Sequence, residues 1–290
     1  MAEMPVCKKQ HYLPAVYLRE FSVDQAHISR DSRVWRCDGK RSKPVFIANE
    51  CCANYFYSKE QAISVETMFQ NTELFYAKCV SSIKAGKHPT KGQFFGFILI
   101  MFDLHLRNAA YENATGKDRL HAYMLQLGGF KQLLLGRKEK QATNGEVMEH
   151  LRKRWRVRLL LASPGNEFIT SDNPSVLVAS PGTIPNLQLA VLPVTPTHMA
   201  IAYDCQQIKV VGERTTPMDE KLLNPLQLSH AERCVYSSVQ LNTEQQQFVA
   251  ERLNRKSKVR CKTDETAWEA SMRRLVPDVK FSFLRPVIAL

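Results

Sequence analysis

The sequence contains no apolar run long enough to cross a membrane. Its longest, FFGFILIMF at residues 94–102, is followed at once by Asp103 and His105, whereas a transmembrane helix needs about 20 apolar residues. The start, MAEMPVCKK, also lacks the apolar core and the small-residue cleavage site of a secretion signal. We therefore expect a cytoplasmic protein with no membrane partner.

Paired cysteine motifs are missing as well. The chain has eight cysteines, but Cys51 and Cys52 are adjacent and the others are scattered, with no C-x-x-C spacing of the kind that zinc sites use. Thiols stay reduced in the cytoplasm. We interpret these cysteines as small buried apolar residues.

The signature motifs of several common enzyme classes are also absent. The sequence has no G-x-x-x-x-G-K-[ST], no dinucleotide-binding glycine fingerprint, no H-E-x-x-H and no G-x-S-x-G. P-loop nucleotide hydrolases, zinc proteases of the H-E-x-x-H type and ordinary esterases are therefore poor candidates. We expect no nucleotide cofactor.

Acidic residues are few compared with basic ones. The chain has 28 Asp and Glu against 40 Lys and Arg, which gives a net charge of +12. An excess of this size favours an anionic partner such as nucleic acid, although it can also serve solubility alone. Two basic segments stand out: HLRKRWRVR at residues 150–158, which includes Trp155, and RLNRKSKVRCK at residues 252–262. Each is either a solvated helix face or a footprint for phosphates.

The patterns along the chain predict an α+β fold, in which an N-terminal hairpin and long helices pack with a C-terminal, mostly antiparallel sheet and two late helices. Asp38-Gly39 marks the hairpin turn. Helices are expected at about 59–85, 92–113, 118–135 (broken at Gly128-Gly129), 147–156, 218–237 and 243–256, with strands in RVRLLLAS, EFITSD, SVLVAS, LQLAVLPV, HMAIAYD and IKVVGE. Residues 1–150 form the hairpin and helical part and residues 151–290 the sheet part, and we expect one integrated domain.

The sharpest local signal is FITSDNP, residues 168–174, where four polar residues stand before a proline. In one interpretation Thr170, Ser171, Asp172 and Asn173 bond nearby backbone and form a structured turn. In the other, a strand end displays them in a cleft, where Asp172 can bind a cation or orient a substrate.

The opening stretch KKQHYLPAVYLREF, residues 8–21, could supply the other half of such a polar site. His11 could be a general base, a metal ligand or a core histidine with satisfied hydrogen bonds. Arg19 could bind substrate or form a structural salt bridge, and Tyr17 packs with a hydroxyl that can reach polar groups.

Charged residues on the predicted helices are further candidates. Glu66 and Glu73 stand seven residues apart, on one face of their helix, beside an apolar stripe. Asp103 and Arg107 stand at i and i+4, so they either pair on the surface or place Arg107 where its guanidinium can bind carboxylate or phosphate.

Three of these stretches together resemble a bacterial family, domain-of-unknown-function family 4238, over nearly its whole length. The opening stretch fits its His-Tyr-x-Pro-x-x-Tyr-Leu-Arg-x-Phe motif, FITSDNP fits its Phe-x-Thr-Ser-Asp-Asn-Pro motif, and LPVTP at residues 192–196 is similar to its Leu-Pro-x-Ser-Pro-like strand, with Thr195 where serine is usual. The late helix ending near CVYSS is also similar. The chain departs at Arg107-Asn108-Ala109, where the family tends to have Arg-Thr-Pro.

The resemblance implies a bacterial intracellular protein and no particular activity. It also implies that five of the candidate residues meet in space. These are His11, Arg19, Glu66, Glu73 and Asp172.

Our first hypothesis is an enzyme that acts on nucleic acid or another phosphate ester, such as a metal-dependent nuclease. Glu66, Glu73 and Asp172 would hold Mg²⁺ or Mn²⁺, and His11 would move protons. The candidate substrate-binding residues are Tyr17, Arg19, Arg107, Thr170, Ser171 and Asn173. The alternative is a non-enzymatic nucleic-acid-binding or sensor module of a stress or phage-response system, in which the same polar cluster is structural. An enzyme needs an open pocket there, whereas a structural network would be closed.

Overall fold

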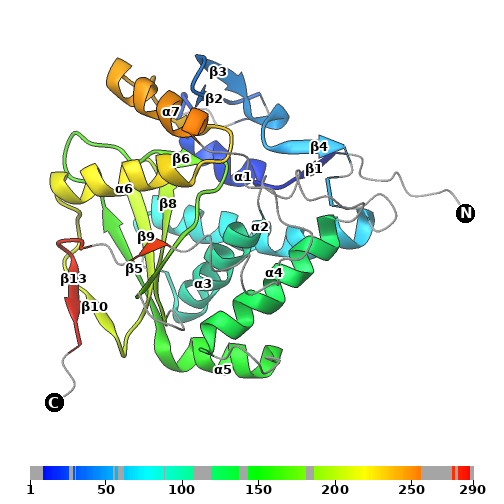
Figure 1. Ribbon diagram of the computed structural model, residues 1–290, viewed down its shortest axis with the longest axis vertical. Coiled ribbons are helices and arrows are strands. Elements are labelled where there is room, and N and C mark those ends of the chain that lie inside the picture. Colours follow the sequence, from blue (N-terminus) through cyan, green and yellow to red (C-terminus); the bar gives the residue numbers. More distant parts are fainter. Residues whose placement is uncertain are drawn as a thin grey trace, which may run out of the picture.

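The fold is described from a computed structural model (Figure 1). It describes residues 9–25, 29, 31–54, 56–57, 62–87, 89–107, 119–136, 143–180, 186–255, 276–277 and 280–287. Within these ranges long helices pack with mostly antiparallel sheets, which confirms the predicted α+β class.

The N-terminal part is built around the predicted hairpin. Strand β1 (Lys9–His11) pairs antiparallel with β4 (Cys52–Asn54), and helix α1 (Ala15–Leu18) and the 3-10 turns η1 (Arg19–Phe21) and η2 (Ile47–Asn49) lie between them in sequence. Strands β2 (Arg33–Cys37) and β3 (Ser42–Phe46) form the hairpin. At its tip Asp38 Oδ1 accepts the backbone N–H groups of Lys40 and Arg41 at 3.0 and 2.9 Å, and Gly39 has φ +78°. The Asp-Gly turn is therefore confirmed.

Four helices follow: α2 (Ala62–Lys84), α3 (Lys91–Leu106), α4 (Arg119–Leu134) and α5 (Asn144–Arg154). Helices α3 and α5 each begin at a threonine, Thr90 and Thr143, that forms a capping box. The proposed cap Ser58 of the first helix and residues 108–113, expected at the end of the second, lie outside the described residues.

The predicted break in the third helix is wrong, because α4 runs unbroken through Gly128-Gly129. Each glycine costs about 1 kcal/mol of helix stability relative to alanine. Buried Tyr123, Phe130 and Leu133 lie on both sides of the pair, and their packing outweighs this cost.

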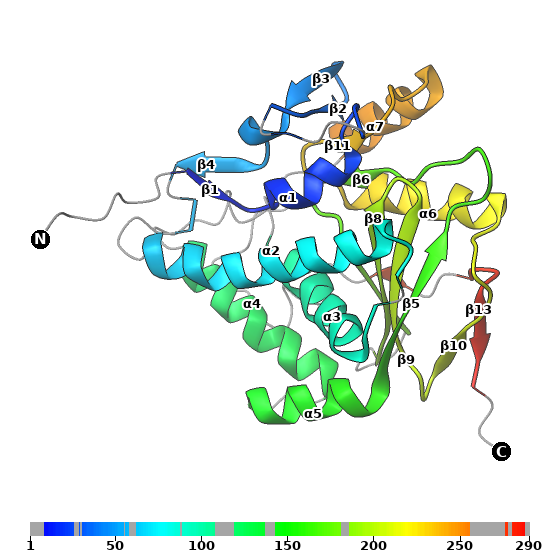
Figure 2. The ribbon, with the colours of Figure 1, turned by 180° about the vertical axis from the view of Figure 1, so that it is seen from behind.

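The main sheet has the strand order β12–β7–β8–β9–β5, comprising β12 (Val276–Pro277), β7 (Val176–Ser180), β8 (Asn186–Thr195), β9 (His198–Asp204) and β5 (Trp155–Leu161). Its pairs are antiparallel except β12–β7, which confirms the mostly antiparallel sheet. Side chains alternate between its two faces. One face packs under α3 and α4, and the other packs against α6 and the Phe281–Phe283 turn (Figures 1 and 2).

A smaller sheet has the order β3–β2–β11–β6, with β11 (Val235–Ser237) between β2 and β6 (Thr170–Ser171). Helix α6 (Pro217–His230) therefore stops well before residue 237, and the expectation of helix through CVYSS is wrong. Val235 and Tyr236 are buried within this sheet, where β-branched and aromatic residues pack well. Helix α7 (Thr243–Arg255) lies so close to the hairpin tip that a Cβ on Gly39 would come within 2.9 Å of Ala250 Cα. Strand β10 (Ile208–Val210) pairs with β13 (Leu284–Pro286).

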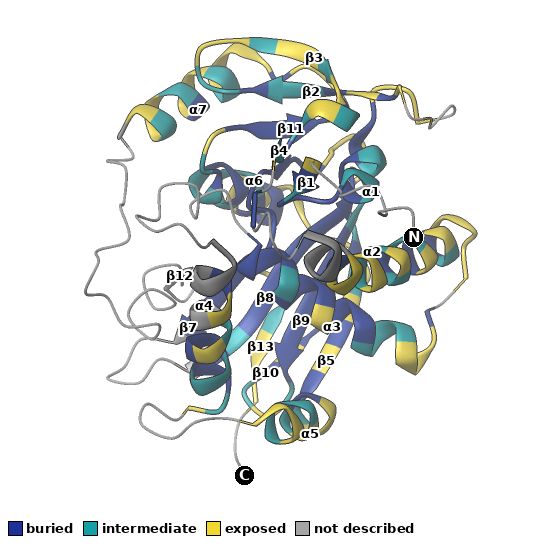
Figure 3. Cartoon of the chain, turned by 90° about the vertical axis from the view of Figure 1, so that its right-hand side faces the viewer, coloured by how far each residue is buried: buried dark blue, intermediate teal, exposed yellow. Residues whose placement is uncertain are grey.

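The largest core joins the helices to one face of the main sheet, and it contains residues from both sides of position 150, such as Phe97 and Leu192. Buried residues are concentrated in the sheets and on the inner faces of the helices (Figure 3). The six cysteines in the described ranges are free thiols. None of the described helices is both long and apolar enough to span a membrane.

Candidate functional site

The opening stretch and FITSDNP meet directly, through Tyr17. Its buried hydroxyl donates to the carbonyl of Pro193 at 2.7 Å and lies 2.6 Å from Thr170 Oγ1. Because the single phenolic proton is used on Pro193, Thr170 is the donor of the second bond. Burial raises the pKa of Tyr17. The three motifs that resemble the family, at Tyr17, Thr170 and Pro193, are thus joined at one closed point.

Within FITSDNP the polar side chains bond backbone. The carboxylate of Asp172, which is 0% exposed, accepts the N–H groups of Glu232 and Arg233 at 2.8 and 2.9 Å. The amide of Asn173 donates to the carbonyl of His230 at 3.2 Å, and Ser171 Oγ accepts the N–H of Asn173 at 3.2 Å. This turn therefore anchors the chain where it leaves α6.

A second polar cluster surrounds Arg107, at the C-terminus of α3. Its Nη2 donates to Glu73 Oε1 at 2.9 Å and to the carbonyl of His11 at 2.7 Å. Its Nη1 lies 3.6 Å from Asp103 Oδ2, and the guanidinium covers the ring of Phe69 at 4.0 Å. We call these five residues the Arg107 network.

The structure thus brings together three predicted site residues, His11, Glu73 and Arg107, and adds Asp103, which itself accepts a hydrogen bond from Tyr123 at 3.1 Å. Arg107 is only 1% exposed and has two carboxylates beside it. A guanidinium whose charge is balanced in this way attracts an anion much less than a free one does.

Burial shifts the pKa of two members of the Arg107 network. It raises the pKa of Asp103, and the Arg107 cation opposes this shift. It lowers the pKa of His11 to about 4, and the cations of Lys9 and Arg107 act in the same direction. His11 is therefore neutral at pH 7, and its contribution to stability is lost as the pH falls below about 6.5, the pKa of an unfolded histidine.

The remaining predicted residues do not complete a metal site in the described part of the chain. Glu66 lies two turns before Glu73 on α2, but its side chain is outside the described residues. Arg19 lies in η1, and its charge contributes to lowering the pKa of His11. Among the described residues, no three His, Cys, Asp or Glu side chains come close enough together to hold a metal ion.

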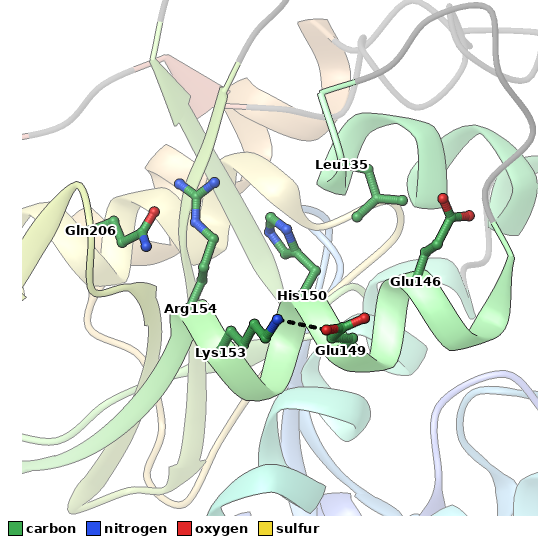
Figure 4. A pocket seen from close by; sticks show the side chains of 7 residues that line it. All are labelled: Leu135, Glu146, Glu149, His150, Lys153, Arg154 and Gln206. Carbon is green, nitrogen blue, oxygen red and sulfur yellow. Dashed lines mark ion pairs between the residues drawn. The ribbon is translucent and has the colours of Figure 1, made fainter.

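A surface pocket of about 360 Å³ lies between α5, the end of α4 and the turn after β9 (Figure 4). Its charges are mixed and largely paired: Lys153 Nζ is 2.6 Å from Glu149 Oε1, and Arg154 pairs with Asp204. The lining residues are Leu135, Glu146, Glu149, His150, Lys153, Arg154 and Gln206. A pocket with two glutamates in its wall does not favour a polyanion.

A larger groove, of about 590 Å³, lies between the start of α3 and the start of β5, which are neighbours in the fold (Figure 2). We call it the α3–β5 groove. Strand β5 is at the edge of the main sheet, and among the described strands it pairs with β9. The lining residues are Lys91, Gly92, Phe94, Phe95, Ile98, Arg152, Trp155, Arg156 and Val157.

The α3–β5 groove has an apolar floor and a cationic rim. Lys91, Arg152 and Arg156 are exposed, and within the described part of the chain none of them forms an ion pair. Arg152 lies 5.6 Å from the ring centroid of Phe95, and Arg156 is fixed by hydrogen bonds to the carbonyls of Arg152 and Trp155. No acidic residue is among the described residues that line the groove.

The sequence alone points to only one side of this groove, the basic segment at residues 150–158 around Trp155. Phe94 and Phe95, by contrast, stand out only as the start of the longest apolar run. Both residues, at the first turn of α3, are half-buried: they pack against the core and also line the groove. The sequence signal is the combination of paired aromatics just after a helix cap with a distant basic segment that contains an aromatic residue.

Comparison with known proteins gives one result. No curated protein and no solved structure matches the chain. A family model described as "Protein of unknown function (DUF4238)" matches residues 9–240, which include the opening stretch, FITSDNP and β11. The chain therefore belongs to this family.

Proposed function

We propose that the protein is a non-enzymatic nucleic-acid-binding module and that the α3–β5 groove is its contact surface. The observation that carries this proposal is the grouping of three exposed cations, Lys91, Arg152 and Arg156, around an aromatic floor. Within the described part of the chain these cations form no ion pair, and no acidic residue is among the described lining residues. Binding to nucleic acid is dominated by neutralised phosphates, and arginine is well suited to that role.

The charge of the surrounding surface supports the same proposal. Arg158 is exposed on β5, two residues beyond Arg156 and therefore on the same side of the strand. It extends the row of cations away from the groove, and its Nη2 donates to the carbonyl of Gly212 at 3.3 Å. The net charge of +12 adds long-range attraction for a polyanion.

The state of the predicted catalytic residues also favours a binding module. Asp172 is fully buried and bonded to backbone, and Arg107 is buried beside two carboxylates. Neither residue lines either of the pockets described above. A buried, bonded network is what a structural role requires, whereas an enzyme needs these groups to face a substrate.

Binding is tested by fluorescence anisotropy with a labelled oligonucleotide over a series of salt concentrations. We expect affinity to fall steeply with salt, and Arg152→Gln/Arg156→Gln to weaken binding roughly tenfold or more while reducing the slope of log K against log [salt] by about one to two units. The matched control, Lys209→Gln/Lys221→Gln, removes the same charge from exposed positions on β10 and α6. If both double variants lost affinity for the oligonucleotide equally, the groove would have no special role in binding.

An enzyme acting on phosphate esters is the second candidate, because two members of the Arg107 network have shifted pKa values. His11 Nε2 and Arg107 Nε are buried without a hydrogen-bond partner in the described part of the chain, and the pKa of Asp103 is raised. Shifts of this kind are typical of functional sites as well as of structural ion pairs.

The two candidates predict different fates for the nucleic acid. As a binding module, the protein leaves labelled RNA and DNA intact after incubation with Mg²⁺, with Mn²⁺ and with EDTA. Metal-dependent cleavage on a denaturing gel, abolished by Glu73→Gln and by His11→Gln at unchanged melting temperatures, would instead establish the enzyme and place its site in the Arg107 network.

A further inference from the structure

The floor of the α3–β5 groove indicates which form of nucleic acid fits it. We propose that the groove binds single-stranded nucleic acid, with bases stacked on Phe94 and Phe95 and phosphates paired with Lys91, Arg152 and Arg156. This inference rests on the proposed function and adds the state of the strand to it. Phosphate pairing alone would need only the cationic rim, so the partly exposed rings require a further explanation.

Stacking gives these rings a role. Aromatic side chains beside a row of cations are the usual means by which proteins hold single strands, because every base has a π face to stack. The guanidinium of Arg152 lies over the ring of Phe95, at 5.6 Å from its centroid, and Arg152 is exposed. A base stacked on this face of Phe95 would take the place of the guanidinium, which could then cover the outer face of the base and add cation–π attraction.

The shape of the groove favours unpaired bases. Bases in a duplex are already stacked on one another and present only their edges, so they cannot lie on a protein ring. A volume of about 590 Å³ is within the range of sites that enclose small ligands. The groove is thus of a size for one or two nucleotides, whereas a duplex would touch only the rim.

The lining residues also predict what the groove does not recognise. Its described side chains are apolar or cationic, with no hydroxyl, amide or carboxylate group. The side-chain groups that could contact a 2′-hydroxyl or the edge of a base are therefore N–H donors, and the proposal pairs the three cations with phosphates instead. We therefore expect similar affinities, within about threefold, for DNA and RNA strands of equal length, and only a weak preference among bases.

The test compares four labelled 12-mers by fluorescence anisotropy at one low salt concentration: oligothymidine, oligouridine, a DNA duplex, and an abasic strand with the same number of phosphates. We expect the wild type to bind the two single strands about tenfold or more tightly than the abasic strand and the duplex. Phe94→Ala and Phe95→Ala should each remove most of the preference for the single strands, whereas Phe95→Trp should keep it. The control Phe248→Ala, at an exposed aromatic on α7, should not change this preference.

The wild-type arm needs no folded variant, so the inference can be decided even if an alanine variant unfolds. Equal binding of single strand, abasic strand and duplex would overturn stacking while leaving polyanion binding in place. Binding to none of the four at low salt would overturn the proposed function itself. Preference for the single strands that persists in both folded alanine variants would show that the bases lie somewhere other than the α3–β5 groove.

Discussion

Asp172→Ala is expected to lower the free energy of unfolding by about 2–4 kcal/mol, because the N–H groups of Glu232 and Arg233 lose their hydrogen bonds to a fully buried carboxylate, at about 1–3 kcal/mol each. Both oxygens of Asp172 are engaged, by Glu232 and Arg233, so Asp172→Asn, which keeps one oxygen, should lose about half as much. The measurement is urea unfolding followed by circular dichroism, with the m-value checked for constancy.

The matched control is Asp31→Ala, which removes an exposed carboxylate from a turn and should change stability by less than about 0.5 kcal/mol. The result also bears on the metal hypothesis. If Asp172 were instead held in an open cleft for a metal ion, its removal would change the stability of the metal-free protein only a little. A loss below about 1 kcal/mol for Asp172→Ala would therefore contradict the anchoring role.

Arg107→Met is expected to lower the free energy of unfolding by about 3 kcal/mol at pH 7.5, because it leaves the half-buried carboxylates of Glu73 and Asp103 without their shared cation. The exposed Arg41→Met is the control and should have little effect. Replacing Asp103 with asparagine in the Arg107→Met background should restore part of the loss, since the two residues are coupled.

The stability that Arg107→Met loses should also depend on pH. Burial raises the pKa of Asp103, so the native state holds this proton more tightly than the unfolded chain, and the group favours folding most at low pH and less as the pH rises. Removing the cation that opposes this shift raises the pKa of Asp103 further. Urea unfolding should therefore give a smaller loss at pH 4.5 than at pH 7.5, and equal losses at the two values would contradict the coupling.

The sequence is sufficient to predict those parts of the fold that depend on local rules. The hairpin turn follows from the φ preference of Gly39 and the bonding of Asp38, and the main sheet follows from its alternating short strands. Local rules fail where tertiary packing decides, as in α4, whose glycines are tolerated because neighbouring side chains are buried. They fail again in CVYSS, which becomes β11 because two other strands flank it.

The candidate sites, too, depend on tertiary packing that local sequence rules do not predict. The spacing of Asp103 and Arg107 predicts that they can pair, but burial of the pair depends on α2 and β1, which supply Glu73 and the His11 carbonyl. Likewise, Phe95 and Arg152 belong to different elements, and only the packing of α3 on β5 places them in one groove. Contacts between distant segments are not visible in the periodicity of either segment.

The position of β11 has a consequence for how the chain is made. This strand separates β2 from β6 in the small sheet, so the hairpin at residues 33–46 cannot complete its pairing until residue 237 has left the ribosome. Because a chain is synthesised at about 5–20 residues per second, one edge of the hairpin stays unpaired for roughly 10–40 s. During synthesis this edge is open to chaperones and to neighbouring nascent chains, and chains that terminate early, before β11, would expose it permanently.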